Sequence, residues 1–338
     1  MAYTTIDKPN THFNTKLYAG NGSTQSITTG LDNDFVWIKR RTAVSNHRLF
    51  DILRGGANDL GSNTTSVEGQ NTQGITFNST GFDLLGADLS YNGSSDTYAS
   101  WNWKAGGTAV SNTDGTITSS VSANTINGFS IVSYTGNLTG GATIGHGLGD
   151  VPKFVIVKNI AAAAWDWTCY HASLGNTRRI FLNSNSAGDT SSGGWNNTTP
   201  SSSVVTLGAG NETNNSNTMI AYCFAEKKGF SKFGSYAGNG STDGTFIYTG
   251  FKPAFIMVKS AVGGTGNWQI NDSARDTFNL CNKPVYANLS DAESVDTSWD
   301  AVSNGFKMRQ GFGSKNGSGR TYIYMAFAEA PIVGSNNV

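Results

Sequence analysis

Carboxylates are the first candidates for chemistry, and the chain has few glutamates: Glu68, Glu212, Glu226, Glu293 and Glu329. A glycoside hydrolase needs two carboxylates that flank the scissile bond. Glu226 and Glu329 each end a segment of the type Phe-Ala-Glu, so they occupy equivalent positions in two similar stretches of sequence. Equivalence of this kind indicates a structural role at an exposed strand end. We therefore predict no catalytic residue and expect that the chain is not an enzyme.

Metal and cofactor sites are not predicted either. The four histidines have neither helical nor hairpin metal spacing: His12, His47, His146 and His171. The three cysteines are an odd and widely spaced set, which argues against a disulfide scaffold and a zinc site: Cys169, Cys223 and Cys281. Gly145-His-Gly-Leu-Gly149 resembles a nucleotide-binding loop only superficially, because no helical pattern follows it.

Aromatic residues beside polar loops are the candidates for ligand recognition. Trp165 and Trp195 lie near the long polar segment 183–203. A ring face packs against the C–H groups of a sugar, and nearby amides bond its hydroxyls. Trp167 is expected in the core, because Trp268 matches it elsewhere in the chain. The candidate ligand contacts are therefore Trp165 and Trp195, together with His171.

An internal repeat organises the chain. One strand-like segment recurs three times, as Phe35-Val-Trp-Ile-Lys39, Phe154-Val-Ile-Val-Lys158 and Phe255-Ile-Met-Val-Lys259. A Tyr-x-Gly-Asn marker precedes each copy, beginning at Tyr18, Tyr134 and Tyr236. The spacing of the markers predicts three units of about 100 residues, each the size of a small domain.

The composition indicates how each unit folds. The chain is rich in turn residues such as Gly, Asn and Ser, and also in strand residues such as Thr, Val and Phe. Long helical periodicity is missing. The sequence therefore predicts an all-β protein of three tandem antiparallel β-sandwich units.

The strand that closes each unit alternates between two apolar faces. In the third copy Tyr322, Tyr324 and Ala326 share one face, and Met325 and Phe327 share the other. Such a strand is covered on both sides or faces a neighbouring domain. The lysine that ends each Phe-Val-Trp-Ile segment is expected to extend into solvent.

The boundaries follow from these markers. Residues 1–14 are expected to form an N-terminal arm, with Tyr3, Ile6 and Phe13 as its candidate docking residues. The remaining divisions are repeat 1 at 15–107, a linker or edge strand at 108–127, repeat 2 at 128–227, repeat 3 at 229–330 and a tail at 331–338.

Charge and hydropathy exclude several classes of function. Charged residues make up 14% of the chain and the formal net charge is zero, which gives no basic surface for nucleic acid. No stretch approaches the ~20 apolar residues of a membrane-spanning helix, so membrane insertion is not expected. The first residues have neither a basic nor an apolar signal-peptide region, so no signal peptide is expected.

The first repeat resembles a known group of sequences. The similarity lies in residues 1–8, in Phe13-Asn-Thr-Lys-Leu-Tyr18, in Asp34-Phe-Val-Trp-Ile-Lys39, in His47-Arg-Leu-Phe-Asp51 and in residues 92–107. Together these segments resemble an uncharacterised repeat-domain family of marine, cyanophage-like phage tail and virion structural proteins, thought to be lectin-like β-sandwiches. The second and third repeats resemble it more loosely.

The resemblance implies lectin-like or jelly-roll-like sandwiches, synthesis in the host cytoplasm, a virion location and an adhesive or architectural role. It supplies no catalytic residues. In a virion protein, Tyr3, Ile6 and Phe13 of the N-terminal arm would dock on other virion proteins. We expect a tail-fibre or spike-like subunit that contacts the host surface, with other virion proteins, copies of itself and a host surface glycan as partners, and a homotrimer as its assembly. One alternative is a capsid decoration or head-appendage protein. Another is a surface-polysaccharide depolymerase. No cofactor is expected.

Overall fold

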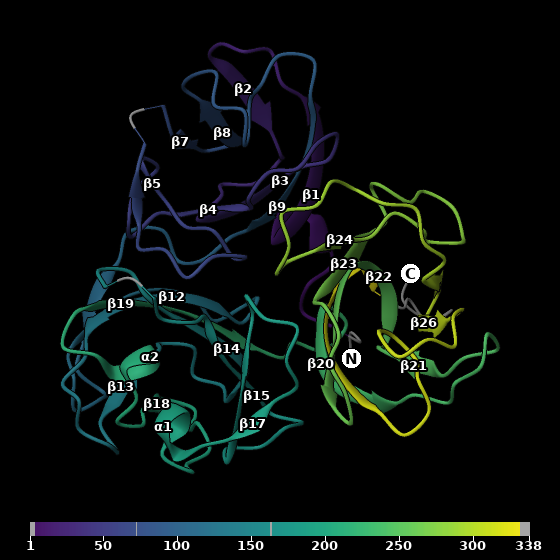
Figure 1. Ribbon diagram of the computed structural model, residues 1–338. Helices are drawn as coiled ribbons and strands as arrows, with labels where there is room; N and C mark the ends of the chain where they lie inside the picture. The colour runs from purple at the N-terminus through teal and green to yellow at the C-terminus, as the bar shows by residue number, and fades with distance from the viewer. Residues whose placement is uncertain (1–3, 72, 163, 332–338) are drawn as a thin grey trace.

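The computed structural model describes residues 4–71, 73–162 and 164–331, and it is built almost entirely of β-strands (Figure 1). The helices of the described residues are one 3₁₀ turn, η1 (Pro9–Thr11), and two four-residue helices, α1 (Ser192–Trp195) and α2 (Asn211–Asn214). The predicted all-β class is confirmed. Among these residues no helix is long and apolar enough to cross a membrane.

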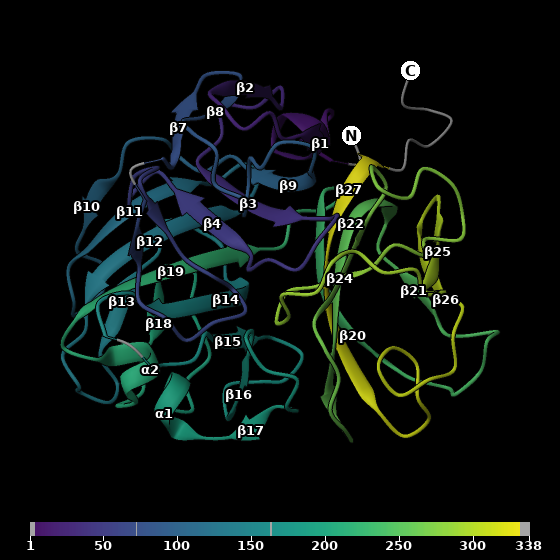
Figure 2. The same cartoon turned by 45° about the horizontal axis from the view of Figure 1, so that its top comes forward.

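The strands form three lobes, each with one large and one small antiparallel sheet (Figures 1 and 2). In lobe one, residues 13–103, the large sheet has the order β1 (Phe13–Ala19), β9 (Thr97–Trp103), β3 (Phe35–Arg40) and β4 (Arg48–Asp51). Its small sheet has the order β2 (Gln25–Thr28), β8 (Gly81–Leu84) and β7 (Ile75–Asn78). A short pair is formed by β5 (Asn58–Asp59) and β6 (Gly69–Gln70).

Lobe two, residues 110–225, has the widest sheet. Its order is β10 (Val110–Asn112), β11 (Ser119–Asn124), β12 (Phe129–Thr135), β19 (Thr218–Ala225), β14 (Pro152–Asn159), β15 (Thr168–His171), β16 (Arg178–Phe181) and β17 (Asp189–Thr190). The small sheet pairs β13 (Thr143–Gly145) with β18 (Val204–Thr206). The segment predicted as a linker or edge strand contributes β10 and β11, which lie at one edge of this sheet.

Lobe three, residues 231–331, repeats the strand order of lobe one. Its large sheet runs β20 (Ser231–Ala237), β27 (Thr321–Pro331), β22 (Phe251–Val262), β23 (Gln269–Asp272) and β24 (Val285–Tyr286). Its small sheet runs β21 (Phe246–Tyr248), β26 (Gly305–Met308) and β25 (Trp299–Val302). In all three lobes the closing strand lies between the strand that contains the marker tyrosine (β1, β12 or β20) and the strand of the Phe-Val-Trp-Ile type (β3, β14 or β22). The residue boundaries of three separately folding units stay a prediction.

Each Tyr-x-Gly-Asn marker closes its lobe by the same contacts. The tyrosine hydroxyl donates to the carbonyl just before a buried asparagine: Tyr18 to Tyr91, Tyr134 to Thr213 and Tyr236 to Lys315, at 2.5–2.7 Å. That asparagine, which is Asn92, Asn214 or Asn316, accepts from a backbone N–H of the marker. A Cβ at the marker glycine would lie 2.2 Å from a backbone oxygen, so only glycine fits there. The marker is therefore structural.

The hydrophobic residues form four clusters. Three are private to one lobe each and lie between its large and small sheets. The fourth is shared, because the inner faces of all three large sheets meet at the centre of the molecule, with Trp103, Phe224 and Phe327 at equivalent positions (Figure 1). The predicted phase of the third closing strand is confirmed: Tyr322, Tyr324 and Ala326 lie in the cluster private to lobe three, and Phe327 lies in the shared core.

Hydrogen bonds join the lobes in a ring around this core. Equivalent side chains contact a carbonyl of the next lobe: His47 at Tyr286, Trp167 at Gly61 and Trp268 at Phe181, over 2.8–2.9 Å. The repeat lysines are fully buried, not solvent-exposed as the sequence suggested. Lys39 donates to Ser45 and to Ser290 of lobe three, and Lys158 donates to Trp165 and to Thr65 of lobe one. Backbone oxygens of two lobes thus replace water around each of these two ammonium groups.

Candidate functional site

The described residues hold no group of three or more His, Cys, Asp or Glu side chains that could bind a metal ion. All three cysteines are buried and unpaired, and burial raises the pKa of the Cys223 thiol to about 12. Burial likewise lowers the pKa of His47 to about 3, so its ring is neutral and bonds Trp37 and a backbone carbonyl. These buried groups pack the interior of the lobes.

Two of the three predicted ligand contacts are inaccessible. Trp195 is fully buried in the core of lobe two, where its ring packs edge-on against Tyr170 at 5.7 Å. His171 is buried against lobe three, at 3.2 Å from the Tyr324 carbonyl, and burial lowers its pKa to about 4. The prediction is therefore wrong for both, because each fills a gap in a core. Trp165 is half-buried and lies in the loop that receives Lys158.

The N-terminal segment is not a free arm. Phe13 is the first residue of β1, pairs with Trp103 and stacks on Phe327 at 4.9 Å. Ile6 is buried in the same shared core. Both side chains are thus unavailable for docking, because they complete the contact between lobes one and three. Tyr3 lies outside the described residues.

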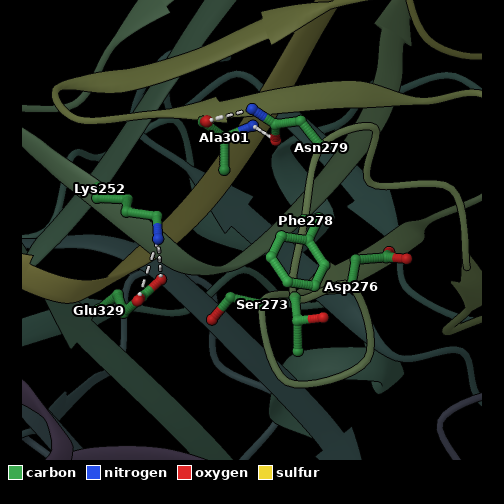
Figure 3. A pocket seen from close by; sticks show the side chains of 8 residues that line it. Lys252, Ser273, Asp276, Phe278, Asn279, Ala301 and Glu329 are labelled. Atoms are coloured by element: carbon green, nitrogen blue, oxygen red, sulfur yellow. Dashed lines mark hydrogen bonds and ion pairs between the residues drawn. The ribbon is translucent and has the colours of Figure 1, made fainter.

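An open pocket of about 440 Å³ lies in lobe three, beside the loop that follows β23 (Figure 3). The loop contributes most of the lining, and strands β22, β25 and β27 contribute the rest. The lining residues are Lys252, Ser273, Asp276, Thr277, Phe278, Asn279, Ala301 and Glu329. Its volume lies within the ~300–1,000 Å³ of small-molecule sites.

A buried ion pair fixes the base of the pocket loop. Asp272 and Arg275 are both inaccessible to solvent and lie 2.6 Å apart. Arg275 also donates to the carbonyls of Ile270 and Lys283, so its guanidinium ties the two ends of the loop together. Trp101 of lobe one donates its indole N–H to Asp272 at 2.9 Å. The loop is therefore held by its own lobe and by lobe one.

The middle of the loop is fixed to the small sheet. The Asn279 side chain donates to the Ala301 carbonyl and accepts from its N–H, both at 2.9 Å, which pairs the loop with β25 (Figure 3). On the opposite wall Lys252 and Glu329 form an ion pair at 3.0 Å. These contacts fix the pocket loop and the opposite wall, and a site on fixed side chains loses little conformational entropy when a ligand binds.

The lining groups available to a ligand are an aromatic ring, two hydroxyls and one oxygen of the Asp276 carboxylate, whose other oxygen accepts the Lys283 N–H. Phe278 is 85% exposed, the most exposed large apolar side chain among the described residues. Its ring stands inside the pocket next to Ser273 and Asp276 (Figure 3). The hydroxyls of Ser273 and Thr277 make no hydrogen bond to any described residue. A ring face flanked by hydroxyl and carboxylate groups suits a sugar, whose C–H face is apolar and whose edge is polar.

Sequence analysis missed this site. Phe278 stands in the polar run Asp276-Thr-Phe-Asn-Leu280, and neither of the other repeats has an aromatic residue there. An aromatic residue in a polar segment, with no matching aromatic residue in the other repeats, is also the feature that made Trp165 and Trp195 candidates. Glu329 was noticed only as a strand end, which it is, although it also lines the pocket.

The family comparison covers the whole three-lobed body. The model of a protein family described as "Domain of unknown function (DUF7483)" matches residues 8–331, and the chain belongs to this family. The match runs from just before η1 to the end of β27, so one family model spans all three lobes. Neither the curated proteins nor the solved structures contain a match.

Proposed function

We propose that this chain is a non-enzymatic phage virion protein, a tail-fibre or spike-like subunit that binds a glycan of the host surface. The resemblance of residues 1–107 to phage tail and virion proteins supports the virion location. The observation that carries the adhesive role is the pocket of lobe three, in which the exposed Phe278 ring stands beside unpartnered hydroxyls. Other virion proteins and further copies of the chain are the proposed partners.

Assembly as a homotrimer fits this role. Closed rings are the general rule for homo-oligomers, and a single open pocket of this size binds a sugar weakly. Joining weak sites raises overall avidity by ~10²–10⁴ without any new contact. A trimer would present three copies of the pocket. Because the net charge of the chain is zero, electrostatic repulsion between the copies would be small.

Cell binding with matched variants tests the adhesive role. Fluorescently labelled protein is added to a panel of marine cyanobacterial strains, and the bound fraction is measured. We expect Phe278→Ala to lose at least tenfold in binding. The control is Phe312→Ala, since Phe312 is 71% exposed but lies outside the pocket. Equal binding of both variants, or no binding by the wild type, would overturn the adhesive role.

Location on the particle distinguishes the tail-fibre proposal from the head-decoration alternative. Antibodies raised against the purified chain are applied with gold label to particles of the phage that encodes it. Label at the tail tip supports the proposed role. Label spread over the head would replace it with capsid decoration, and unlabelled particles would remove the virion role.

A depolymerase has one observation in its favour, because Asp276 and Glu329 line the same pocket. Glu329 is already paired with Lys252, and Asp276 accepts from the Lys283 N–H at 3.1 Å. We therefore favour binding over hydrolysis. Incubation with host polysaccharide should release no new reducing ends. Release that Asp276→Asn abolishes would establish the enzyme instead.

A further inference from the structure

A second cavity adjoins the pocket of lobe three at the boundary with lobe one. It has a volume of about 230 Å³ and shares two lining residues, Ser273 and Glu329, with the first. Asn10, Asn14 and Thr15 line it from η1 and β1, and strands β22 and β27 form the other side. The two cavities are therefore neighbours, and Ser273 and Glu329 line both of them.

The polar groups of the second cavity are suited to a hydrated ligand. Asn10 is exposed, and its side chain makes no hydrogen bond to any described residue. Asn14 donates its amide N–H to the Thr29 carbonyl at 2.6 Å, which fixes the side chain and leaves its carbonyl oxygen as an acceptor. Amide groups of this kind both donate to and accept from sugar hydroxyls.

We propose that the two cavities form one groove that binds an extended neutral oligosaccharide, with one sugar ring on Phe278 and the next beside Asn10 and Asn14. This inference rests on the proposed glycan-binding function and specifies the ligand of that site. The oligosaccharide would cross the boundary between lobe three and lobe one at Ser273. A monosaccharide would occupy only the end at Phe278.

The charges of the groove define the class of sugar. Lys252 is paired with Glu329 at 3.0 Å, so the cation among the lining residues of the first cavity is already occupied, whereas Asp276 adds a second carboxylate to that lining. The second cavity adds amides and a hydroxyl but no cationic side chain. A uronate or sialate would be repelled by Asp276 in a site partly shielded from water. Neutral rings meet no such penalty.

Both ends of the groove stand on fixed elements. The Phe278 end stands on the loop that Arg275 and Asp272 hold, and Trp101 of lobe one bonds the same aspartate. Phe13, which also lines the second cavity, packs against Phe255 and Phe327 of lobe three at 5.5 and 4.9 Å. The lobes therefore keep the two subsites in a constant relation, so that both can act on one ligand.

The test measures how binding depends on chain length. The full chain is applied to a printed array of neutral and uronate-containing saccharides of one to six rings, and hits are titrated in solution. We expect neutral chains of two or more rings to bind at least tenfold more tightly than the matching monosaccharide. Phe278→Ala should weaken the binding of every saccharide that the wild type binds. Asn10→Ala should weaken only the longer chains.

The control is Thr11→Ala, because Thr11 is an exposed polar residue of the same turn and lines neither cavity. It should bind like the wild type. Monosaccharides that bind as tightly as longer chains, or an Asn10→Ala variant that keeps full affinity for longer chains, would overturn the groove while the proposed function stands. A wild-type chain that binds no saccharide overturns the glycan-binding function itself.

Discussion

Phe327 is the residue at which the coupling of the three lobes can be tested most sharply. Its ring is buried in the shared core, where it stacks on Phe13 of lobe one at 4.9 Å and lies 6.2 Å from Phe224 of lobe two. Truncation of a buried phenylalanine to alanine costs ~3–5 kcal/mol, because the lost contacts leave a cavity. We expect Phe327→Ala to lose that amount of stability.

The size of the shift in melting temperature shows how much of the chain unfolds with Phe327. Unfolding of all 338 residues carries an entropy of ~0.7 kcal/mol/K, so the loss should lower Tm by ~4–7 °C. If lobe three unfolded alone, its entropy would be ~0.2 kcal/mol/K, and its own transition would fall by ~14–24 °C. The shared core predicts the smaller shift in a single transition.

Differential scanning calorimetry measures both quantities. Phe312→Ala is the control, since its ring is 71% exposed and its loss should leave Tm unchanged. A Phe327→Ala trace that splits, with a low-temperature peak carrying about a third of the enthalpy, would refute the coupled core. An unchanged Tm would contradict the burial of the ring.

Three further measurements test individual contacts. Tyr222→Phe removes the hydroxyl that donates to the buried Asp51 carboxylate at 2.7 Å, so urea titration should show a loss of ~1.5–3 kcal/mol, whereas Tyr170→Phe, which breaks no such bond, should change little. His171 has a folded pKa of about 4 against 6.5 when unfolded, so stability should fall as pH drops from 6.5 to 4, and His171→Gln should reduce that fall by up to ~3 kcal/mol. Burial lowers the pKa of Lys259 to about 7, so the unfolded state binds the extra proton above that pH; stability should rise between pH 7 and 9, and Lys259→Met should flatten the rise.

The fold class and the phase of the strands were predictable from the sequence because both depend on local pattern. The alternation of Tyr322, Tyr324 and Ala326 with Met325 and Phe327 placed two apolar faces correctly before any partner was known. The inner face of each large sheet is covered by the other two lobes. This contact depends on how the three lobes are arranged, so it could not be predicted from the local sequence.

The buried lysines illustrate this limit. A lysine at the end of an apolar strand ordinarily extends into solvent. Lys39 cannot, because Ser290, about 250 positions further along the chain, closes over it and supplies a carbonyl at 3.0 Å. The acceptor is a backbone atom, so no residue type at that position marks it. Trp195 was misplaced for a similar reason: its polar neighbours in sequence are not its neighbours in space.

The three lobes share their structural residues and differ in the residues left free, and this difference locates function. Asp51, His171 and Asp272 occupy equivalent positions in the three lobes. Asp51 accepts a hydrogen bond from Tyr222 of lobe two, and Asp272 accepts one from Trp101 of lobe one. Met325, the equivalent donor position in lobe three, has no polar hydrogen to give. His171 therefore stands where an aspartate would be unpaired, and bonds a backbone carbonyl instead. Even this apparent irregularity is structural.

Residues that have equivalents in all three lobes thus make the contacts that join the lobes. Substitutions of these residues are expected to change the stability of the fold. A ligand site must be built from residues that have no matched counterpart and no burial. Phe278 meets both conditions, since it is unmatched in the other lobes and 85% exposed. The loop that carries it branches from Asp272, a residue committed to the ring. The framework that the three lobes share thereby fixes the position of this loop, which agrees with the binding role proposed for lobe three.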